Sequence, residues 1–225
     1  MAVFSAGSLL AQDCRVDVVV DMTEAGRAVA RPTAERPVCY FPFARGYREM
    51  GEVRPGQQAL PAAESIEHLF FQALAADNYL LPTKQSAPSL LFVFEWGYIV
   101  PHVGRATGAG GRTEMSGNSS ETDFALNLVG GQWLTSAAAD DLDLQKGILT
   151  DAAKLPRYFV MITALDFKAS LQKKKVLLWV ARASTEAAGL SLADAIPTLI
   201  SAGVPKFGKA TVKPILFAAP IVRGN

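Results

Sequence analysis

Ionisable side chains that interrupt apolar stretches are the first residues of this sequence that could do chemistry. Glu95, Asp166 and Arg182 each stand among aliphatic and aromatic residues. A buried charge without a partner is energetically expensive, so any buried member must be paired or hydrogen-bonded. A pairing of Glu95 with Arg182 across neighbouring strands would meet that requirement. Such pairs are more often structural than catalytic, and we favour the structural interpretation.

One serine stands in a sequence that resembles a hydrolase nucleophile. Residues 189–193 read GLSLA, between a predicted strand and a predicted helix, where hydrolases place the nucleophile. The segment ends in alanine instead of glycine, and both histidines, His68 and His102, precede the serine, so the Ser–acid–His order fails. We therefore interpret Ser191 and Asp194 as a helix cap and predict no catalytic residue.

A glycine-rich segment over residues 102–120 offers backbone N–H groups that could cradle a phosphate. Gly108 and Gly110 begin a G-x-G pattern, but Thr113 stands where the third glycine of a dinucleotide-binding sequence belongs, and no Gly-Lys-Ser/Thr follows. A surface loop is the favoured interpretation. Two histidines far apart in sequence do not make a zinc site either. We predict neither a cofactor nor a metal.

The stretch YFPFARGY over residues 40–47 has the composition of a binding surface, where aromatic residues and arginine are enriched. Core packing at a strand end explains it as well and is the favoured interpretation. Arg45 and Tyr47 from this stretch join Glu95 and Arg182 as the candidate ligand-binding residues.

The hydrophobic pattern predicts the elements that must position these residues. An apolar stripe at helical spacing from Ile66 to Leu74 predicts a helix over 61–77, and the run 90–100, apolar on both faces, predicts a central strand. Residues 158–167 and 176–185 predict an antiparallel hairpin. Further strands are predicted over 16–20, 38–43 and 215–222 (the last a strand or a packed tail), and further helices over 120–129, 136–153 and 189–202. Residues 45–60 are predicted to be irregular. The fold class is α/β with an α+β tendency: a mixed β-sheet, with a C-terminal antiparallel hairpin, and helices packed on it.

Three consecutive lysines, Lys173 to Lys175, fall at the expected tip of that hairpin. A solvated turn is the favoured interpretation of this charge run. Contact with anionic phospholipid or with a partner is the alternative.

Composition and charge exclude several classes of protein. The chain has 225 residues, 50% of them apolar, with 22 basic against 21 acidic residues and a net charge of +1. The basic excess typical of nucleic-acid binding is missing, and the apolar content is too high for disorder. No run approaches the ~18 apolar residues that span a bilayer. We predict one α/β domain over residues 12–225, with no nucleic-acid partner and no transmembrane segment.

The first eleven residues, MAVFSAGSLLA, carry no charge and precede a polar stretch. This pattern is typical of the end of a secretory signal, so residues 1–11 are predicted to be a signal-peptide remnant; a buried first element is the alternative. In an exported protein, Cys14 and Cys39 could form a disulfide. Two reduced cysteines that pack as small apolar residues are equally compatible with the sequence.

Two pairs of segments within residues 65–185 resemble one type of family. SIEHLFFQALAADNYLL followed by PSLLFVFEWGYI forms the first pair, and RYFVMITALDF followed by KKVLLWVARAST forms the second. Together they resemble bacterial envelope lipoproteins of unknown function and, more remotely, accessory subunits of curli secretion and of lipid-transport ABC systems. Asp166 matches the family's closing hairpin, whereas Asn78 and Ser89 stand where glycine and aspartate are typical. The resemblance implies an α/β sandwich in the periplasm or on the outer membrane, and it brings no catalytic residues.

The resulting hypothesis is a non-catalytic cell-envelope protein that binds another envelope protein or a ligand. The alternative is an enzyme or small-molecule-binding domain whose site is formed by loops 45–60 and 102–120. A deep pocket in which Glu95, Arg182 or Asp166 converge would favour the alternative. A shallow surface with an exposed apolar patch would favour the hypothesis.

Overall fold

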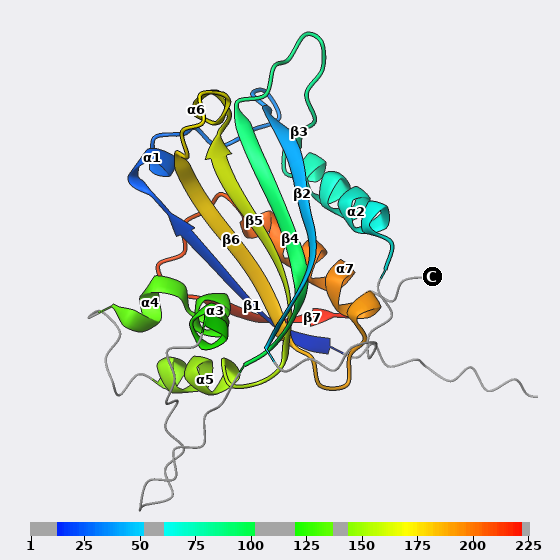
Figure 1. Cartoon of the computed structure of the whole chain (residues 1–225), viewed down its shortest axis with the longest axis vertical. Coiled ribbons are helices and arrows are strands. Elements are labelled where there is room, and N and C mark those ends of the chain that lie inside the picture. The colour runs from blue at the N-terminus through cyan, green and yellow to red at the C-terminus, as the bar shows by residue number, and fades with distance from the viewer. Residues whose placement is uncertain (1–12, 52–60, 102–119, 137–143, 222–225) are drawn as a thin grey trace, which may run out of the picture.

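The computed structural model describes residues 13–51, 61–101, 120–136 and 144–221 as a mixed β-sheet with helices on both faces (Figure 1). The strands are β1 (Asp13–Met22), β2 (Val38–Gly51), β3 (Tyr79–Leu80), β4 (Leu90–Val100), β5 (Arg157–Asp166), β6 (Leu177–Glu186) and β7 (Ile215–Pro220). The helices are α1 (Glu24–Arg27), α2 (Ala63–Ala76), α3 (Ser120–Val129), α4 (Gly131–Thr135), α5 (Leu144–Ala152), α6 (Phe167–Leu171), α7 (Leu192–Gly203) and the short 3-10 helix η1 (Val204–Lys206). The predicted mixed α/β fold class is confirmed.

The strands of the sheet follow the order β3-β2-β4-β5-β6-β1-β7. β2 runs parallel to β3 and β4, and every other neighbouring pair is antiparallel. The predicted hairpin is therefore confirmed as β5 and β6, with α6 at its tip. The run 90–100 becomes β4, an interior strand with several residues buried on both faces, as its apolar pattern predicts.

One face of the sheet is covered by α2 and α7, and the main core lies beneath them. Ile66, Phe70 and Leu74 form the buried stripe of α2 at the predicted helical spacing. The Phe70 ring lies 4.9 Å from the ring of Phe94 on β4, centroid to centroid. Alternate residues of each strand reach this side because side chains in a strand point to opposite faces in turn.

The opposite face of the sheet, here called the second face, carries helices over part of its length. α3, α4 and α5 gather at one end of the molecule, whereas α6 lies at the other end (Figure 1). Beneath them lies a smaller apolar cluster that includes Leu128, Leu149 and Phe159. One half of the second face is therefore a second core.

The structure differs from the sequence-based expectations at three places. β2 continues to Gly51 through a β-bulge between Ala44 and Gly46, where irregular structure was expected from residue 45 onward. Of the helix expected over 136–153, the described part is α5. Within the segment 189–202, where Pro197 implies a kink or two short turns, the structure has one helix, α7, over Leu192–Gly203. The proposed signal-peptide remnant 1–11 and nearly all of the glycine-rich segment lie outside the described residues.

The two cysteines are free, which corrects the candidate disulfide between Cys14 and Cys39. Cys14 lies on β1 and Cys39 on β2, and three strands of the sheet separate these two. Neighbouring strands lie ~4.8 Å apart, so the two Cα atoms are well beyond the ~7 Å that a disulfide can span.

Every helix among the described residues is too short or too polar to cross a bilayer.

Candidate functional site

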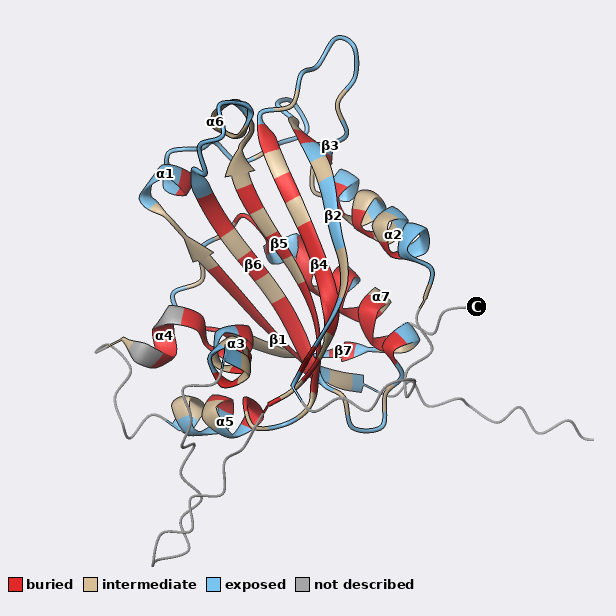
Figure 2. Ribbon diagram, viewed as in Figure 1, coloured by how far each residue is buried: buried red, intermediate tan, exposed pale blue. Residues whose placement is uncertain are grey.

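Half of the second face carries no helix among the described residues, and most of its side chains are apolar. The strand register aligns Phe41 and Phe43 of β2 with Leu91 and Val93 of β4, and these with Thr163 and Leu165 of β5. We call these six residues the apolar half-face. Their neighbours in sequence, such as Phe92 and Ile162, point into the main core. In Figure 2 the corresponding part of β4 alternates between buried and intermediate residues, while β2 is largely exposed.

The exposure of the two phenylalanines is high for their size. Phe41 is 46% exposed and Phe43 is 54% exposed, although both lie inside a strand. Burying one such side chain is worth ~2 kcal/mol, so leaving both in water forgoes a sizeable stabilisation. Contiguous exposed apolar surface of this kind is typical of a binding site.

Helix α6 closes one end of the apolar half-face. Asp166 begins this helix, and its carboxylate accepts a hydrogen bond of 2.7 Å from the Ala169 backbone N–H. The Phe167 ring lies 5.7 Å from the Phe41 ring, centroid to centroid. Between α6 and the strands lies an open hollow of about 610 Å³, to which Leu171 and Lys175 also contribute. Its size is in the range of ligand-binding pockets, which run ~300–1,000 Å³.

A row of charged side chains separates the apolar half-face from the helix-covered half. Glu95 is almost fully buried, and its two carboxylate oxygens accept hydrogen bonds from Arg48 at 2.9 Å and from Arg45 at 3.5 Å. On the neighbouring part of the sheet, Arg182 donates to Asp21. Each carboxylate is thus paired with a guanidinium group, which compensates its removal from water.

The predicted pairing of Glu95 with Arg182 is wrong. β4 and β6 are not neighbours, because β5 lies between them. The register places Met161 of β5 opposite Glu95 on one side and opposite Arg182 on the other. Each charge therefore finds a partner on a strand that it touches: β2 for Glu95 and β1 for Arg182.

The four predicted binding residues do not form one site. Arg45 lies at the rim of the hollow, and Glu95 and Arg182 lie in the charged row. Tyr47 packs on the main core side, and its hydroxyl donates a 2.7 Å hydrogen bond to Glu49. Burial raises the pKa of Tyr47, and the bond to Glu49 adds to this effect. Of the four, Arg45 is the residue that lines the hollow.

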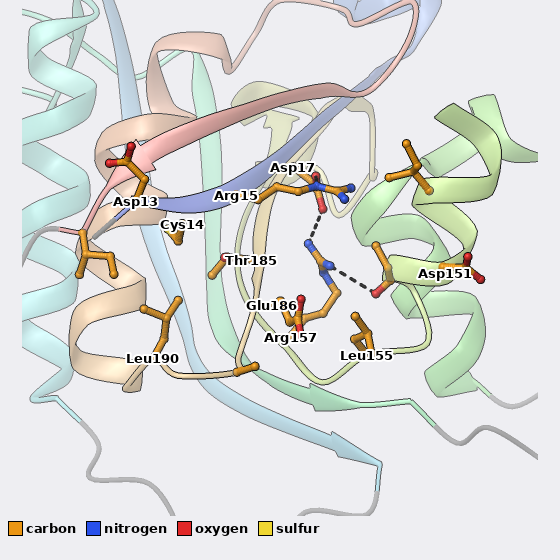
Figure 3. A pocket seen from close by; sticks show the side chains of 14 residues that line it. Asp13, Cys14, Arg15, Asp17, Asp151, Leu155, Arg157, Thr185, Glu186 and Leu190 are labelled. Carbon is orange, nitrogen blue, oxygen red and sulfur yellow. Dashed lines mark hydrogen bonds and ion pairs between the residues drawn. The ribbon is translucent and has the colours of Figure 1, made fainter. Parts of the chain in front are cut away.

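A second hollow, of about 430 Å³, lies at the opposite end of the sheet, next to α5 (Figure 3). At its floor Arg157 and Asp17, which are 2% and 0% exposed, point toward each other and form an ion pair. Arg157 also donates to the Ser184 hydroxyl and to the Ala152 carbonyl oxygen. Burial lowers the pKa of Arg157, and the adjacent Asp17 carboxylate opposes that shift.

Sequence reasoning missed this pair, although one signal was present. Asp17 stands alone in the apolar run Val16–Val20, where a charge demands a partner. Arg15 supplies a further hydrogen bond to Asp17 at 2.7 Å. Because the Asp17 oxygens and the Arg157 guanidinium are engaged with each other and with neighbouring groups, the cluster is suited to holding strands together.

The remaining candidate features have structural roles. The Ser191 hydroxyl accepts the Asp194 backbone N–H at 3.1 Å and donates to the Asp194 carboxylate at 2.7 Å, so the predicted helix cap is confirmed. His68 is exposed and shares a hydrogen bond with Gln72. Within the described ranges, no three His, Cys, Asp or Glu side chains gather as metal ligands would. His102 lies outside those ranges.

Comparison with known proteins finds remote structural likeness. No family model matches the chain, and no curated protein matches it. A PDZ domain protein from Parabacteroides distasonis is similar in structure at 10% sequence identity with a TM-score of 0.43; the match covers 92% of this chain but 39% of that protein. The PelC dodecamer from Paraburkholderia phytofirmans is similar at 14% identity with a TM-score of 0.33, over 86% of this chain and 98% of PelC. Both likenesses are too remote to carry a functional argument.

Proposed function

We propose that this protein is a non-catalytic binding protein of the cell envelope, and that its binding surface is the apolar half-face. One observation carries the proposal: two phenylalanines, about half exposed, stand beside aliphatic side chains on a sheet face that no described helix covers. A folded protein gains stability by covering such residues with its own chain. Exposed apolar residues are expected instead where a bound partner buries them.

The charged groups near the surface support binding over reaction. Catalytic acids and bases need a free lone pair or proton that faces the substrate. Glu95 is engaged by two arginines, and Asp166 is engaged in capping α6. These charges stabilise the sheet around the hollow, so the hollow offers an apolar floor with cations, Arg45 and Lys175, at its rim.

The face of the sheet suits a ligand better than its edge does. Beyond Cys39, β2 pairs with no described strand on its outer side, so within the described residues it is an edge strand. The Cys39 carbonyl oxygen accepts a hydrogen bond from the Ser89 N–H, on the β4 side of β2. Because the backbone N–H and C=O groups of successive residues point to opposite sides of a strand, the backbone nitrogen of Pro42 faces the outer edge. Its missing N–H and the bulge at Ala44 and Gly46 weaken the edge as a template for an added strand.

Export is the second part of the proposal, and it rests on the uncharged segment 1–11. Expression in a Gram-negative host, followed by fractionation and N-terminal sequencing, tests it. We expect the protein in the envelope fraction with a mature N-terminus near Gln12. An intact N-terminus in the cytosolic fraction would remove the envelope part and leave the binding surface to be judged separately.

Binding of the neutral apolar dye Nile red tests the surface itself. We expect the folded protein to bind it saturably, with increased fluorescence, at about one site per chain. Phe43→Ser removes a half-exposed ring from the hollow and should weaken the binding about tenfold without unfolding the protein.

Leu144→Ser is the matched control, because Leu144 is 78% exposed on α5, at the other end of the second face. It should leave dye binding unchanged. Equal binding by wild type and Phe43→Ser, with both proteins folded by circular dichroism, would contradict the proposed surface.

A further inference from the structure

The tip of the β5–β6 hairpin adjoins the apolar half-face and is strongly basic. Residues 166–177 contain four lysines, at 168, 173, 174 and 175, and a single acidic residue, Asp166. The Asp166 carboxylate is turned inward to the Ala169 N–H at the start of α6. The neighbouring helix α1 brings Glu24 and Arg27, whose charges cancel. This end of the molecule therefore carries a local excess of positive charge on a chain of nearly zero net charge.

Exposed apolar side chains lie among these lysines. Leu171 at the end of α6 is 71% exposed, and Val176 and Leu177 at the start of β6 are 37% and 38% exposed. Phe41 of the apolar half-face contacts Phe167 at the base of the same tip. Lysines interspersed with exposed aliphatic residues form the pattern of surfaces that lie on anionic membranes.

The backbone at Lys173 is a further unusual feature of the tip. Lys173 has a φ of 61°, in the left-handed region that favours glycine. A side chain there costs about 1 kcal/mol relative to glycine. This small strain motivates a test of whether the charge at this position has a function.

The chemistry of the tip favours a lipid surface over a protein. Lysine is depleted in protein–protein interfaces, where arginine and aromatic residues are enriched. At a membrane, by contrast, a lysine keeps its ammonium group among the lipid headgroups while its aliphatic stem contacts apolar material. Each lysine near an anionic membrane contributes attraction without a fixed hydrogen-bond partner.

We propose that the hairpin tip, residues 166–177, docks on the surface of a bilayer that contains anionic lipids. The inference rests on the proposed function in one respect: Leu171 and Lys175 belong both to the tip and to the wall of the hollow. Docking through the tip brings the α6 end of the hollow, whose wall includes Leu171 and Lys175, to the membrane. The partner of the binding surface is then an amphiphile drawn from that bilayer.

Co-sedimentation with vesicles tests the inference. We expect the full chain to bind vesicles of phosphatidylcholine with 30% phosphatidylglycerol (a composition of about one anionic lipid in three), and to bind pure phosphatidylcholine at least tenfold more weakly. Binding should fall as NaCl rises from about 0.05 to 0.5 M, because salt screens the attraction.

Two matched pairs of variants locate the contact. The double variant Lys174→Gln with Lys175→Gln should lower partitioning of the protein onto anionic vesicles about tenfold or more. The control double variant, Lys146→Gln with Lys154→Gln, removes the same charge from the α5 end and should change this partitioning less than twofold. Leu171→Ser should lower partitioning severalfold, and Leu144→Ser should not. Thermal unfolding confirms that each variant is folded.

The outcomes separate this inference from the proposed function. A chain that binds Nile red but no anionic vesicles, or whose tip variants behave like the α5 controls, overturns membrane docking and leaves the binding surface standing. A chain that binds anionic vesicles through the lysines but fails to bind Nile red contradicts the proposed function instead. Equal binding to neutral and anionic vesicles also overturns the role of the lysines.

Discussion

The Tyr40 hydroxyl is buried in the main core and, within the described part of the chain, is the side-chain polar atom that finds no hydrogen-bond partner. Its ring does the packing, stacked 4.7 Å from the Phe92 ring, centroid to centroid. Burial raises the pKa of Tyr40, so the hydroxyl stays neutral. The hydroxyl therefore loses its hydrogen bonds to water on folding without gaining others in exchange.

Tyr40→Phe is accordingly expected to leave the protein as stable as wild type or up to about 1.5 kcal/mol more stable, because it removes the unsatisfied group and keeps the ring. Urea unfolding followed by tryptophan fluorescence measures this. A loss of more than about 1 kcal/mol, which is the net contribution of one hydrogen bond, would mean that the hydroxyl does have a partner.

The ion pair of Arg157 and Asp17 poses the opposite situation, since both groups are buried and each depends on the other. Arg157→Met should lower the free energy of unfolding by about 3–5 kcal/mol, because Asp17 remains as a buried charge with its main partner gone. The double variant Asp17→Leu with Arg157→Met should be less destabilised than the sum of the single variants. A double-mutant cycle in urea measures the coupling, and simple additivity would contradict it.

Two helices, α2 and α6, end at a non-glycine residue that takes the backbone through the left-handed region. Asn78, with a φ of 64°, follows the end of α2, and Lys173, with a φ of 61°, follows α6. Asparagine is well suited to that conformation, whereas lysine is not. The helix-ending role of Asn78 is visible in the sequence; that of Lys173 is not.

Replacing Lys173 by glycine separates stability from function at the hairpin tip. Lys173→Gly should raise the free energy of unfolding by about 1 kcal/mol, because glycine adopts a positive φ without steric penalty. The same change removes one positive charge and should weaken binding to anionic vesicles severalfold. Thermal unfolding and co-sedimentation measure the two effects, and a destabilised variant would show that the lysine side chain makes a contact that holds the turn.

At the scale of the whole molecule, the strand order decides the chemistry of the cysteines. Because β4, β5 and β6 separate β2 from β1, the folded chain should contain two free thiols even under mild oxidation. Thiol titration in denaturant without reductant should find two thiols per chain. A count near zero in monomeric protein would contradict the topology.

The two thiols should differ in reactivity in the folded protein. Burial raises the pKa of Cys14 above its ordinary value of 9.0, so at pH 8 its reactive thiolate is scarcer in the folded chain than in the unfolded chain. In a Cys39→Ser variant, iodoacetamide should therefore modify Cys14 severalfold more slowly without urea than with it. The folded-state rate should rise with pH beyond pH 9, and equal rates in the two states would contradict this burial.

Much of the fold follows from local patterns. The apolar stripe from Ile66 to Leu74 indicates α2, the two-sided apolar run 90–100 indicates β4, and the alternating runs joined by a charged tip indicate the β5–β6 hairpin. The candidate site was far less accessible to this reasoning. Arg45 was named among the candidate binding residues and lies at the rim of the hollow, whereas Phe41, Phe43 and Leu171 were not recognised as an exposed surface.

The sequence by itself determined the elements, because periodicity and capping depend on residues a few positions apart. It also determined that Glu95 and Arg182, if buried, would each need a partner, since an isolated charge is unstable away from water. Only the tertiary structure decided which residues are those partners, and which apolar residues remain exposed to solvent. The reason is physical. An apolar residue contributes the same local sequence pattern whether or not a helix buries it, and the helix that would bury it comes from residues far away along the chain.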